Sequence, residues 1–150
     1  MAQELGLTVT AWSPLAGGVL TGKYLNESTE ASEARYASAD MQQFMGDRER
    51  GNSIAREIKA VSESIGKSAA QVALAWLRTR QQPIIPIIGT RKLAQLKDNL
   101  ESLNVELSTE HLKQLDESSR IELGFPHDFY NLEMVRNFVY AGLADRIDIK

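Results

Sequence analysis

Two short β-branched segments most strongly restrict what this chain can fold into. The first is LTVTAW, residues 7–12, and the second is IIPII, residues 84–88, which ends at Gly89. Their length and composition are those of β-strands. The second segment has no alternating polar residues, as expected of a parallel strand covered on both faces. Because Pro86 cannot donate a hydrogen bond to a neighbouring strand, we expect it near the carboxyl end of this segment.

Apolar residues between and after these strands recur at the spacing of amphipathic helices. Ser68 and Gln71 form a capping box at the start of one such stretch, and Ser108 is placed to cap another. The spacing and the caps predict five helices, over residues 52–66, from Ser68, over 93–103, from Ser108 and over roughly 131–143.

A strand, a loop and a helix thus follow one another twice, which is the repeating unit of parallel α/β sheets and (β/α)8 barrels. A closed barrel needs eight strands and typically about 250 residues, whereas this chain has 150 residues and two predicted strands. Two parallel strands leave unpaired backbone groups along both edges. We therefore expect an α/β fold that is an incomplete part of something larger, and the exposed strand edges would allow pairing with another copy.

A long polar passage, residues 24–51, separates the first strand from the first helix. It mixes Ser, Ala, Glu and Gly without sustained apolar periodicity. A loop of this length inside a compact domain is usually functional, as a lid is, or disordered. At the other end of the chain, residues 120–150 are expected to form a loop and a helix.

Composition excludes several classes of function. The hydrophobic fraction of 43% is sufficient for the core of one domain, and the net charge of −3, with no cluster of Lys or Arg, argues against a nucleic-acid partner. The chain has no cysteine, and its two histidines, His111 and His127, are too far apart for a familiar metal-ligand motif. No segment approaches the length of a membrane span, and the first residues lack the features of a signal peptide. We expect a cytoplasmic, metal-free protein that has no membrane partner.

The turn that follows the second strand has the composition of an anion site. Gly89 permits close backbone approach, and the helix that begins beyond it offers N–H groups and a dipole that attract phosphate. Arg91 can bind a phosphate with two hydrogen bonds, and Lys92 adds a point charge. Gln95 and Asn99 lie one helical turn apart and can reach an adenine edge. The set indicates an adenosine 2′-phosphate, although solvated cations at a helix start would give the same sequence.

The turn that follows the first strand contains a second candidate. The Ser13 hydroxyl and the amides of residues 15–17 can meet a pyrophosphate, whose charge Lys23 can neutralise. An ordinary Pro-Gly turn with an exposed lysine is the alternative. Trp12 lies at the end of the strand, where it lines a substrate or packs in the core.

The tail ELGFPHDFY, residues 122–130, looks like the bacterial members of the aldo-keto reductase family, and three further segments resemble the carboxyl-terminal portion of that family. They are AWSPLAGGVLTGKY (residues 11–24), SAAQVALAWLRTRQQPIIPIIGTRKLAQLKDNL (68–100) and LSTEHLKQLDESS (107–119). The resemblance implies that the two strands are the seventh and eighth of a (β/α)8 TIM barrel, and that the cofactor is a nicotinamide dinucleotide, usually NADP. The family's catalytic Asp, Tyr, Lys and His lie on earlier strands, so the resemblance assigns no catalytic residue here.

The resemblance also implies which residues contact the cofactor. Arg35, in the long polar loop, resembles a cofactor-clamping arginine of the family but is better explained as a solvated charge. Thr90 and Lys92 are less well matched than the other positions of this turn and helix. The cofactor-binding positions that the resemblance implies are Ser13, Pro14, Leu15, Ala16, Gly17, Lys23, Gly89, Thr90, Arg91, Gln95, Asp98 and Asn99.

Two hypotheses follow from the sequence. In the first, the chain is the NADP(H)-binding portion of an oxidoreductase that reduces small carbonyl compounds to alcohols by hydride transfer. In the second, it is a catalytically silent fragment that acts as an assembly module and pairs with itself or with an amino-terminal half.

Overall fold

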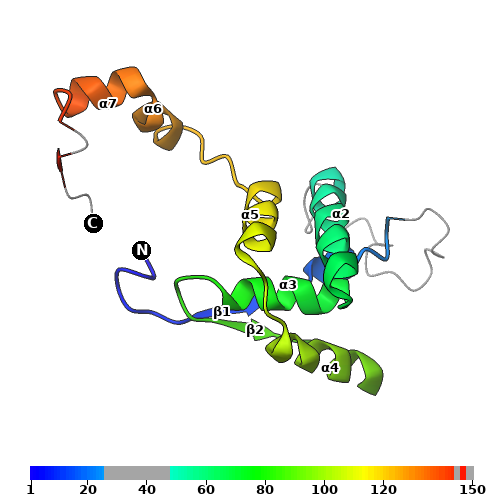
Figure 1. The fold of residues 1–150 in the computed structure, drawn as a ribbon. Helices are drawn as coiled ribbons and strands as arrows, with labels where there is room; N and C mark the ends of the chain where they lie inside the picture. The colour runs from blue at the N-terminus through cyan, green and yellow to red at the C-terminus, as the bar shows by residue number, and fades with distance from the viewer. Residues whose placement is uncertain (26–47, 144–145, 148–150) are drawn as a thin grey trace. The chain divides into compact units, whose positions relative to one another are not determined.

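The computed structural model describes residues 1–25, 48–143 and 146–147. The chain divides into two compact units, Met1–Ser119 and Arg120–Lys150, and each is described by itself below (Figure 1). Most of the long polar loop predicted over 24–51, including Arg35, lies outside the described residues.

A two-stranded parallel sheet lies in the first unit. Strand β1 (Val9–Trp12) pairs with β2 (Ile84–Ile87), with Val9 opposite Ile84 and Trp12 opposite Ile87. Both predicted strands and their parallel pairing are confirmed. Because the strands are parallel, their carboxyl ends lie at one edge, which we call the carboxyl edge of the sheet.

The sheet is covered on one face only. Along β2 burial alternates, and Ile85 and Ile87 are 56% and 50% exposed. Trp12 on β1 is 67% exposed, so it is not a core residue. Helix α3 (Ala69–Arg78) packs against β2, but no second layer of described residues covers the other side chains. The expectation that β2 is covered on both faces is therefore wrong for this chain.

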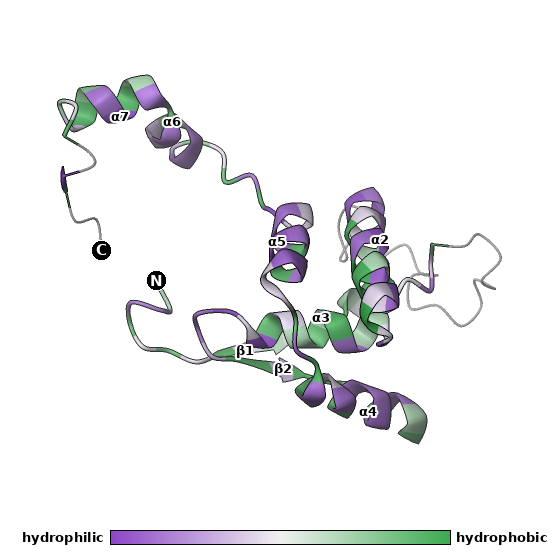
Figure 2. Ribbon diagram, viewed as in Figure 1, coloured by the Kyte–Doolittle hydropathy of each residue, from purple (hydrophilic) through white to green (hydrophobic). Residues whose placement is uncertain are grey.

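The core of the first unit lies among α2 (Arg48–Ile65), α3 and α5 (Thr109–Ser118). Figure 2 shows that α3 is largely hydrophobic, whereas α2 alternates between hydrophobic and hydrophilic residues. Burial of these apolar side chains supplies most of the stabilisation of the unit. The buried cluster consists of Ile58, Val61, Val72, Ala73 and Leu115.

Helix α2 begins at Arg48, whereas the sequence pattern predicts a start at Asn52. The helix packs against the 3-10 helix η1 (Ala16–Thr21), and a Cβ on Gly51 would lie 3.0 Å from Val19 Cγ1. Gly51 therefore permits a close contact inside the helix. Val19 is far from Gly51 in the sequence, so a local sequence pattern does not reveal this contact. The pattern therefore places Gly51 in the preceding loop.

The capping box predicted at the start of α3 is confirmed. The Ser68 hydroxyl accepts a hydrogen bond from Gln71 N at 3.1 Å, and Ser68 N donates to Gln71 Oε1 at 3.2 Å. These two bonds satisfy N–H groups that have no partner within the helix.

The third predicted helix is observed as α4 (Leu93–Leu100), followed by the 3-10 helix η4 (Glu101–Asn104). Its leucines are exposed, and the residues that this region buries are Asn99 and Ser102. We call the exposed leucines the leucine stripe; its members are Leu93, Leu96, Leu100 and Leu103.

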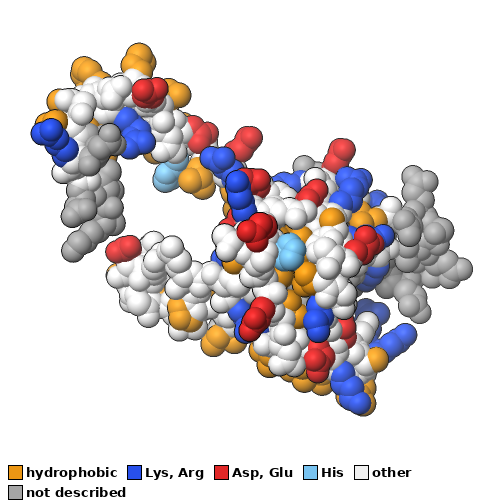
Figure 3. Space-filling model, viewed as in Figure 1, with side chains coloured by type: hydrophobic (Ala, Val, Ile, Leu, Met, Phe, Trp, Pro, Cys, Tyr) orange, Lys and Arg blue, Asp and Glu red, His pale blue; other side chains and the backbone are white. Residues whose placement is uncertain are grey.

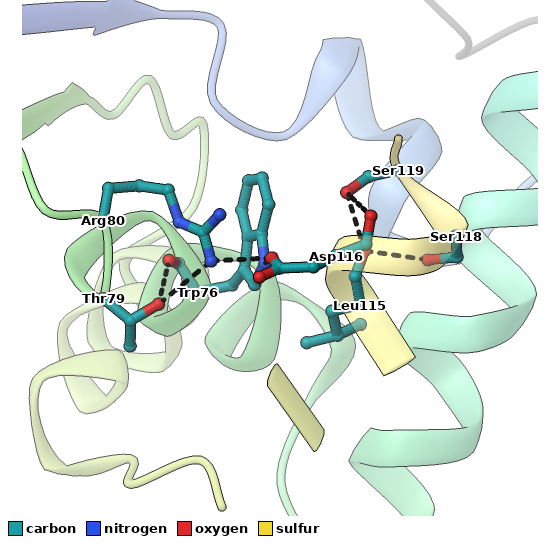
Figure 4. A network of polar contacts seen from close by, with 7 residues as sticks. All are labelled: Trp76, Thr79, Arg80, Leu115, Asp116, Ser118 and Ser119. Atoms are coloured by element: carbon teal, nitrogen blue, oxygen red, sulfur yellow. Dashed lines mark hydrogen bonds and ion pairs between the residues drawn. The ribbon is translucent and has the colours of Figure 1, made fainter. Parts of the chain in front are cut away.

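Asp116 connects α5 to α3 through a polar network (Figure 4). Its Oδ1 atom accepts hydrogen bonds from Trp76 Nε1 and from Arg80 Nη2, both at 2.7 Å. The guanidinium of Arg80 also lies over the Trp76 ring, 4.1 Å from its centroid. The amino-terminal end of α5 is capped by Ser108, as predicted: the Ser108 hydroxyl accepts a hydrogen bond from His111 N. The network complements the apolar packing of Leu115.

The second unit contains α6 (His127–Asn131) and α7 (Glu133–Val139). One helix over roughly 131–143 was expected, but Leu132 is extended, with ψ of 129°, and separates the two. Figure 3 shows hydrophobic side chains at the surface of this unit. Among the described helices, none has both the length and the apolar character needed to cross a membrane.

Replacing Asp116 with Ala is expected to lower the free energy of unfolding by about 1–2 kcal/mol, because two donors lose their shared acceptor. Glu117→Ala is the matched control, since Glu117 faces Lys113 at 3.9 Å and both side chains are well exposed. The control is expected to change stability by less than about 0.5 kcal/mol. Urea denaturation followed by circular dichroism measures both, and equal effects would contradict this role of Asp116.

Candidate functional site

A cavity of about 650 Å³ lies at the carboxyl edge of the sheet. Its volume is in the range of small-molecule sites. It is lined by residues from the turn after β1, from the start of α3 and from the turn between β2 and α4. The structure thus brings together two segments that are far apart in the sequence. The predicted residues that line it are Ser13, Pro14, Leu15, Gly17, Lys23, Gly89, Thr90, Arg91, Gln95, Asp98 and Asn99, together with Lys92; Ala16 does not.

Other lining residues were not predicted. The most important of them lie at the start of α3. Their place at the cavity could have been predicted from the order of the elements. Helix α3 leads into β2, so it runs antiparallel to the strand and begins at the carboxyl edge. The additional residues are Gly18, Thr21, Ser68, Ala69, Ala70, Ile87 and Ile88; Trp12, which was expected to line a substrate or to pack in the core, also lines the cavity.

The turn after β1 has a strongly left-handed backbone. The φ angles of Ser13, Ala16 and Gly17 are 53°, 47° and 62°. Ala16 N donates to Ser13 O at 2.8 Å, and Gly17 N donates to the Ser13 hydroxyl at 3.2 Å. Two of the three amides predicted to face a pyrophosphate are therefore engaged within the turn.

Gly18 makes room for the side chain of Lys23. A Cβ on Gly18 would lie 2.7 Å from Lys23 Cε and 2.8 Å from its Nζ, and the φ of Gly18 is 96°. The Lys23 ammonium also lies over the Tyr24 ring, 4.7 Å from its centroid. The positive charge of Lys23 thus lies beside Gly18, and both residues line the cavity.

The side chain of Gln95 partly caps the start of α4, the helix to which Gln95 belongs. Gln95 Oε1 accepts hydrogen bonds from Arg91 N at 3.1 Å and from Lys92 N at 3.2 Å. These amides are engaged, and so is the Gln95 oxygen that was expected to reach an adenine. In the part of the chain that the structure describes, the N–H groups of Leu93 and Ala94 have no partner. The positive end of α4 remains available through these two residues and the side chains of Arg91 and Lys92.

Gly89 lies in open space between β2 and α4. A Cβ there would meet no atom within 4 Å, and the residue does not adopt the left-handed conformation. Packing within the described residues therefore does not require glycine at this position. A small residue does leave the cavity open beside Arg91.

Asp98 and Asn99 lie next to each other on α4 but have different surroundings. The Asp98 carboxylate accepts from Ser68 Oγ and from Gln71 Nε2, both at 2.8 Å. Asn99 is only 5% exposed, and its side-chain amide has no hydrogen-bond partner among the described residues. The Asn99 amide lines the cavity, where it can bind a polar ligand group.

The charges of the lining residues favour an anion. They include three cations, Lys23, Arg91 and Lys92, and one carboxylate, that of Asp98. In the described part of the chain, no three His, Asp or Glu side chains are grouped to hold a metal ion. The arrangement can attract and orient a phosphorylated ligand.

A second hollow, of about 590 Å³, lies between α2 and α5 and is a poorer candidate. Three carboxylates line it, those of Glu57, Glu110 and Glu117, with Lys113 as its one cation. Hydrogen bonds from its own backbone N–H and from the Ser108 side chain lower the pKa of Glu110, which keeps it ionised. This hollow repels anions.

Ala substitutions at the two glycines of the cavity are expected to differ in their effect on stability. Gly18→Ala places a side chain at a left-handed φ and displaces Lys23, so it should destabilise the chain by about 1–2 kcal/mol. Gly89→Ala meets open space and should change stability by less than about 0.5 kcal/mol. Urea denaturation measures both, and a large loss at Gly89 would show a structural requirement there.

Comparison with known proteins identifies the family. The model of the "Aldo/keto reductase family" matches residues 1–120. The Saccharomyces cerevisiae protein "Putative aryl-alcohol dehydrogenase YFL057C" is 29% identical over 133 residues, which cover 86% of this chain and 84% of the relative.

Two other relatives are longer than this chain. "Uncharacterized oxidoreductase YrpG" of Bacillus subtilis is 34% identical over 77% of this chain, and "Aldo-keto reductase ausK" of Aspergillus calidoustus is 30% identical over 89% of it. The chain spans 33% of the length of each. Because the family model covers most of the sequence, the chain belongs to the aldo/keto reductase family.

Proposed function

We propose that this chain is the NADP(H)-binding portion of an aldo-keto reductase. The family implies a (β/α)8 barrel, and we assign β1 and β2 to its seventh and eighth strands, in the carboxyl-terminal portion. The observation that carries the proposal is the cavity at the carboxyl edge of the sheet, to which both predicted turns contribute cations. Active sites of such barrels lie at this edge.

Arg91 is the residue best suited to the 2′-phosphate of the cofactor. Its guanidinium can donate two hydrogen bonds to one phosphate, with Lys92 and the N–H groups of Leu93 and Ala94 beside it. Asn99 offers its unpartnered amide to the adenine. The unpartnered groups and the cations of the cavity fit an adenosine 2′-phosphate.

Lys23 and Trp12 would contact the rest of the dinucleotide. The ammonium of Lys23 can neutralise the pyrophosphate, and the exposed ring of Trp12 offers a flat apolar surface beside Ile87. When bound, the nicotinamide supplies the hydride that reduces a carbonyl to an alcohol. The lining residues bind and orient the cofactor, but they include no Tyr, His or Glu to transfer the proton. In this proposal the proton donor and the carbonyl-binding surface belong to the rest of the barrel.

Arg91→Ala is expected to weaken NADP⁺ binding by about 10- to 100-fold, because a charge-assisted contact to the 2′-phosphate is lost. Binding of NAD⁺, which lacks this phosphate, should change little. Isothermal titration calorimetry on the chain measures both. Arg56→Ala is the matched control, because it removes the same charge from an exposed position on α2 that does not line the cavity.

A kinetic assay provides the complementary control. The purified chain is expected to show no carbonyl-dependent oxidation of NADPH, because the family's catalytic group is assigned to the rest of the barrel. Equal losses of NADP⁺ and NAD⁺ affinity in Arg91→Ala would contradict the assignment of the 2′-phosphate. Appreciable turnover would contradict the assignment of the proton donor.

A second function, as an assembly module, is favoured by two exposed apolar surfaces. One is the uncovered face of the sheet, with Trp12, Ile85 and Ile87, and the other is the leucine stripe. Strand β2 pairs with β1 along one edge, and no described strand pairs with its other edge. Exposed edges and apolar faces of this kind promote pairing with a further strand. The two functions are compatible, because the added surface would complete the barrel.

If the uncovered sheet face mediates association, Ile85→Lys should shift the chain towards the monomer, because a charge would be buried in the contact. Sedimentation velocity measures the distribution of species. Leu123→Lys is the matched control: Leu123 is similarly exposed but lies in the second unit. Equal shifts in the two variants, or no association of the unmodified chain, would contradict a role of this face in self-association.

A further inference from the structure

The Lys23 side chain, one of the three cations of the cavity, lies over an aromatic ring. Its Nζ atom is 4.7 Å from the centroid of the Tyr24 ring. An ammonium within about 6 Å of an aromatic centroid is attracted to the face of the ring. Lys23 lines the cavity, whereas Tyr24 is not among the described residues that line it. An effect of Tyr24 on a bound ligand is therefore expected to pass through Lys23.

The end of η1 turns the chain so that Tyr24 returns to the start of this 3-10 helix. Gly22 ends η1 with a left-handed φ of 75°, and its N–H donates to Val19 O at 3.0 Å. Glycine is favoured at such a position because a left-handed residue with a Cβ is strained. Beyond it, the Tyr24 hydroxyl lies 3.5 Å from Gly17 O. The turn thus places an aromatic ring beside the lysine that precedes it.

Two contacts restrict where the Lys23 ammonium can lie. A Cβ on Gly18 would be 2.8 Å from Lys23 Nζ, so the lysine passes against the bare backbone of Gly18, and the Tyr24 ring contacts the same ammonium. Lys23 is an exposed residue, and an unrestrained lysine distributes over many rotamers. An ammonium that is ordered before the ligand arrives reduces the entropy cost of binding. On the face of a ring it still has N–H donors for an anion.

The ring of Tyr24, and not its hydroxyl, carries this contact. The distance of 3.5 Å between the hydroxyl and Gly17 O is at the outer limit of a hydrogen bond, so this bond contributes little. The attraction of the ammonium depends on the ring face, which phenylalanine also has. Tyr24→Phe should therefore keep Lys23 in place, and Tyr24→Leu should release it.

We propose that Tyr24 is a positioning residue that holds the Lys23 ammonium at the cavity for the pyrophosphate of the dinucleotide. This inference rests on the proposed binding of NADP(H), and it adds how the charge of Lys23 is oriented. The pyrophosphate meets an ammonium that is already ordered, whereas a freely rotating lysine would have to be ordered by the ligand.

The first test observes Lys23 by NMR in the full chain without ligand. The Hε signals of Lys23 are assigned by their loss in Lys23→Met. They should be shifted upfield by the ring current of Tyr24, remain shifted in Tyr24→Phe and lose the shift in Tyr24→Leu. Unshifted Lys23 signals in the unmodified chain would overturn the proposal, whether or not the chain binds NADP⁺.

The second test is a double-mutant cycle with NADP⁺ as the probe and calorimetry as the readout. Lys23→Met is expected to weaken binding by about tenfold, because a charge-assisted contact is lost. Tyr24→Leu should weaken it by about two- to fivefold, the effect of an exposed contact between a cation and a ring. The double variant should bind no more weakly than Lys23→Met, because Tyr24 acts through Lys23. Tyr24→Phe should bind like the unmodified chain.

Asp116→Ala is the control for a general loss of stability. Asp116 connects α5 to α3 and is not among the described residues that line the cavity. Its replacement should lower the denaturation midpoint and leave NADP⁺ affinity unchanged. Equal losses of affinity in Asp116→Ala and Tyr24→Leu would show that affinity follows stability, and would overturn the positioning role.

Three results of the cycle would also overturn it. An additive loss in the double variant would show that Tyr24 contributes independently of Lys23. Equal losses in Tyr24→Phe and Tyr24→Leu would assign the effect to the hydroxyl, and unchanged affinity in Tyr24→Leu would show that the ring does not position the lysine. Failure of the unmodified chain to bind NADP⁺ would overturn the proposed function, while shifted Lys23 signals would still show the contact with Tyr24. The two failures are thus distinguished.

Discussion

The parallel pairing of β1 with β2 is the constraint on which the rest of the structure depends. A ladder of four residue pairs, from Val9 and Ile84 to Trp12 and Ile87, sets the ends of both strands at one edge. The turns that follow them must then meet at that edge, and α3 must begin there because it leads back into β2. A shift of one residue in this register would turn Trp12 or Ile87 away from the cavity. The site is thus a consequence of strand pairing.

Charge at this site is carried mainly by side chains. Hydrogen bonds within the chain engage the backbone amides of Gly17, Arg91 and Lys92, through Ser13 and Gln95. These bonds stabilise the turns in the absence of a ligand and hold the flanking side chains in place. The cations of the two turns and the first free N–H groups of α4 then provide the attraction for an anion. Preorganised groups of this kind lower the cost of binding.

Local sequence predicted those parts of the structure that local interactions determine. The strands, the capping box at Ser68 and the cap at Ser108 were correct, because each depends on residues within four positions. The start of α2 was wrong, because the helix includes Gly51, which lies close to the distant Val19. The expected helix over roughly 131–143 was wrong because Leu132 adopts an extended conformation within it. The exposure of the leucine stripe and of Ile85 was not foreseen, because helical and strand periodicity presupposes a partner surface on the same chain.

Local sequence likewise predicted only a part of the candidate site. Gly89, Arg91 and Asn99 were identified from their spacing, and the structure places them at one cavity. The hydrogen bonds of Gln95 and Asp98 could not be predicted, since an amide or a carboxylate can serve a ligand or the backbone equally well. Ser68 was recognised as a cap, but its contact with Asp98 depends on how α3 and α4 pack.

Titration of the ¹⁵N-labelled chain with NADP⁺, followed by NMR, tests most directly whether one dinucleotide contacts both turns. If one dinucleotide contacts both turns, the amide signals of residues 13–23 and of residues 89–99 are expected to shift together, with a single dissociation constant. Shifts confined to one of these segments, or two different dissociation constants, would contradict contact with both turns.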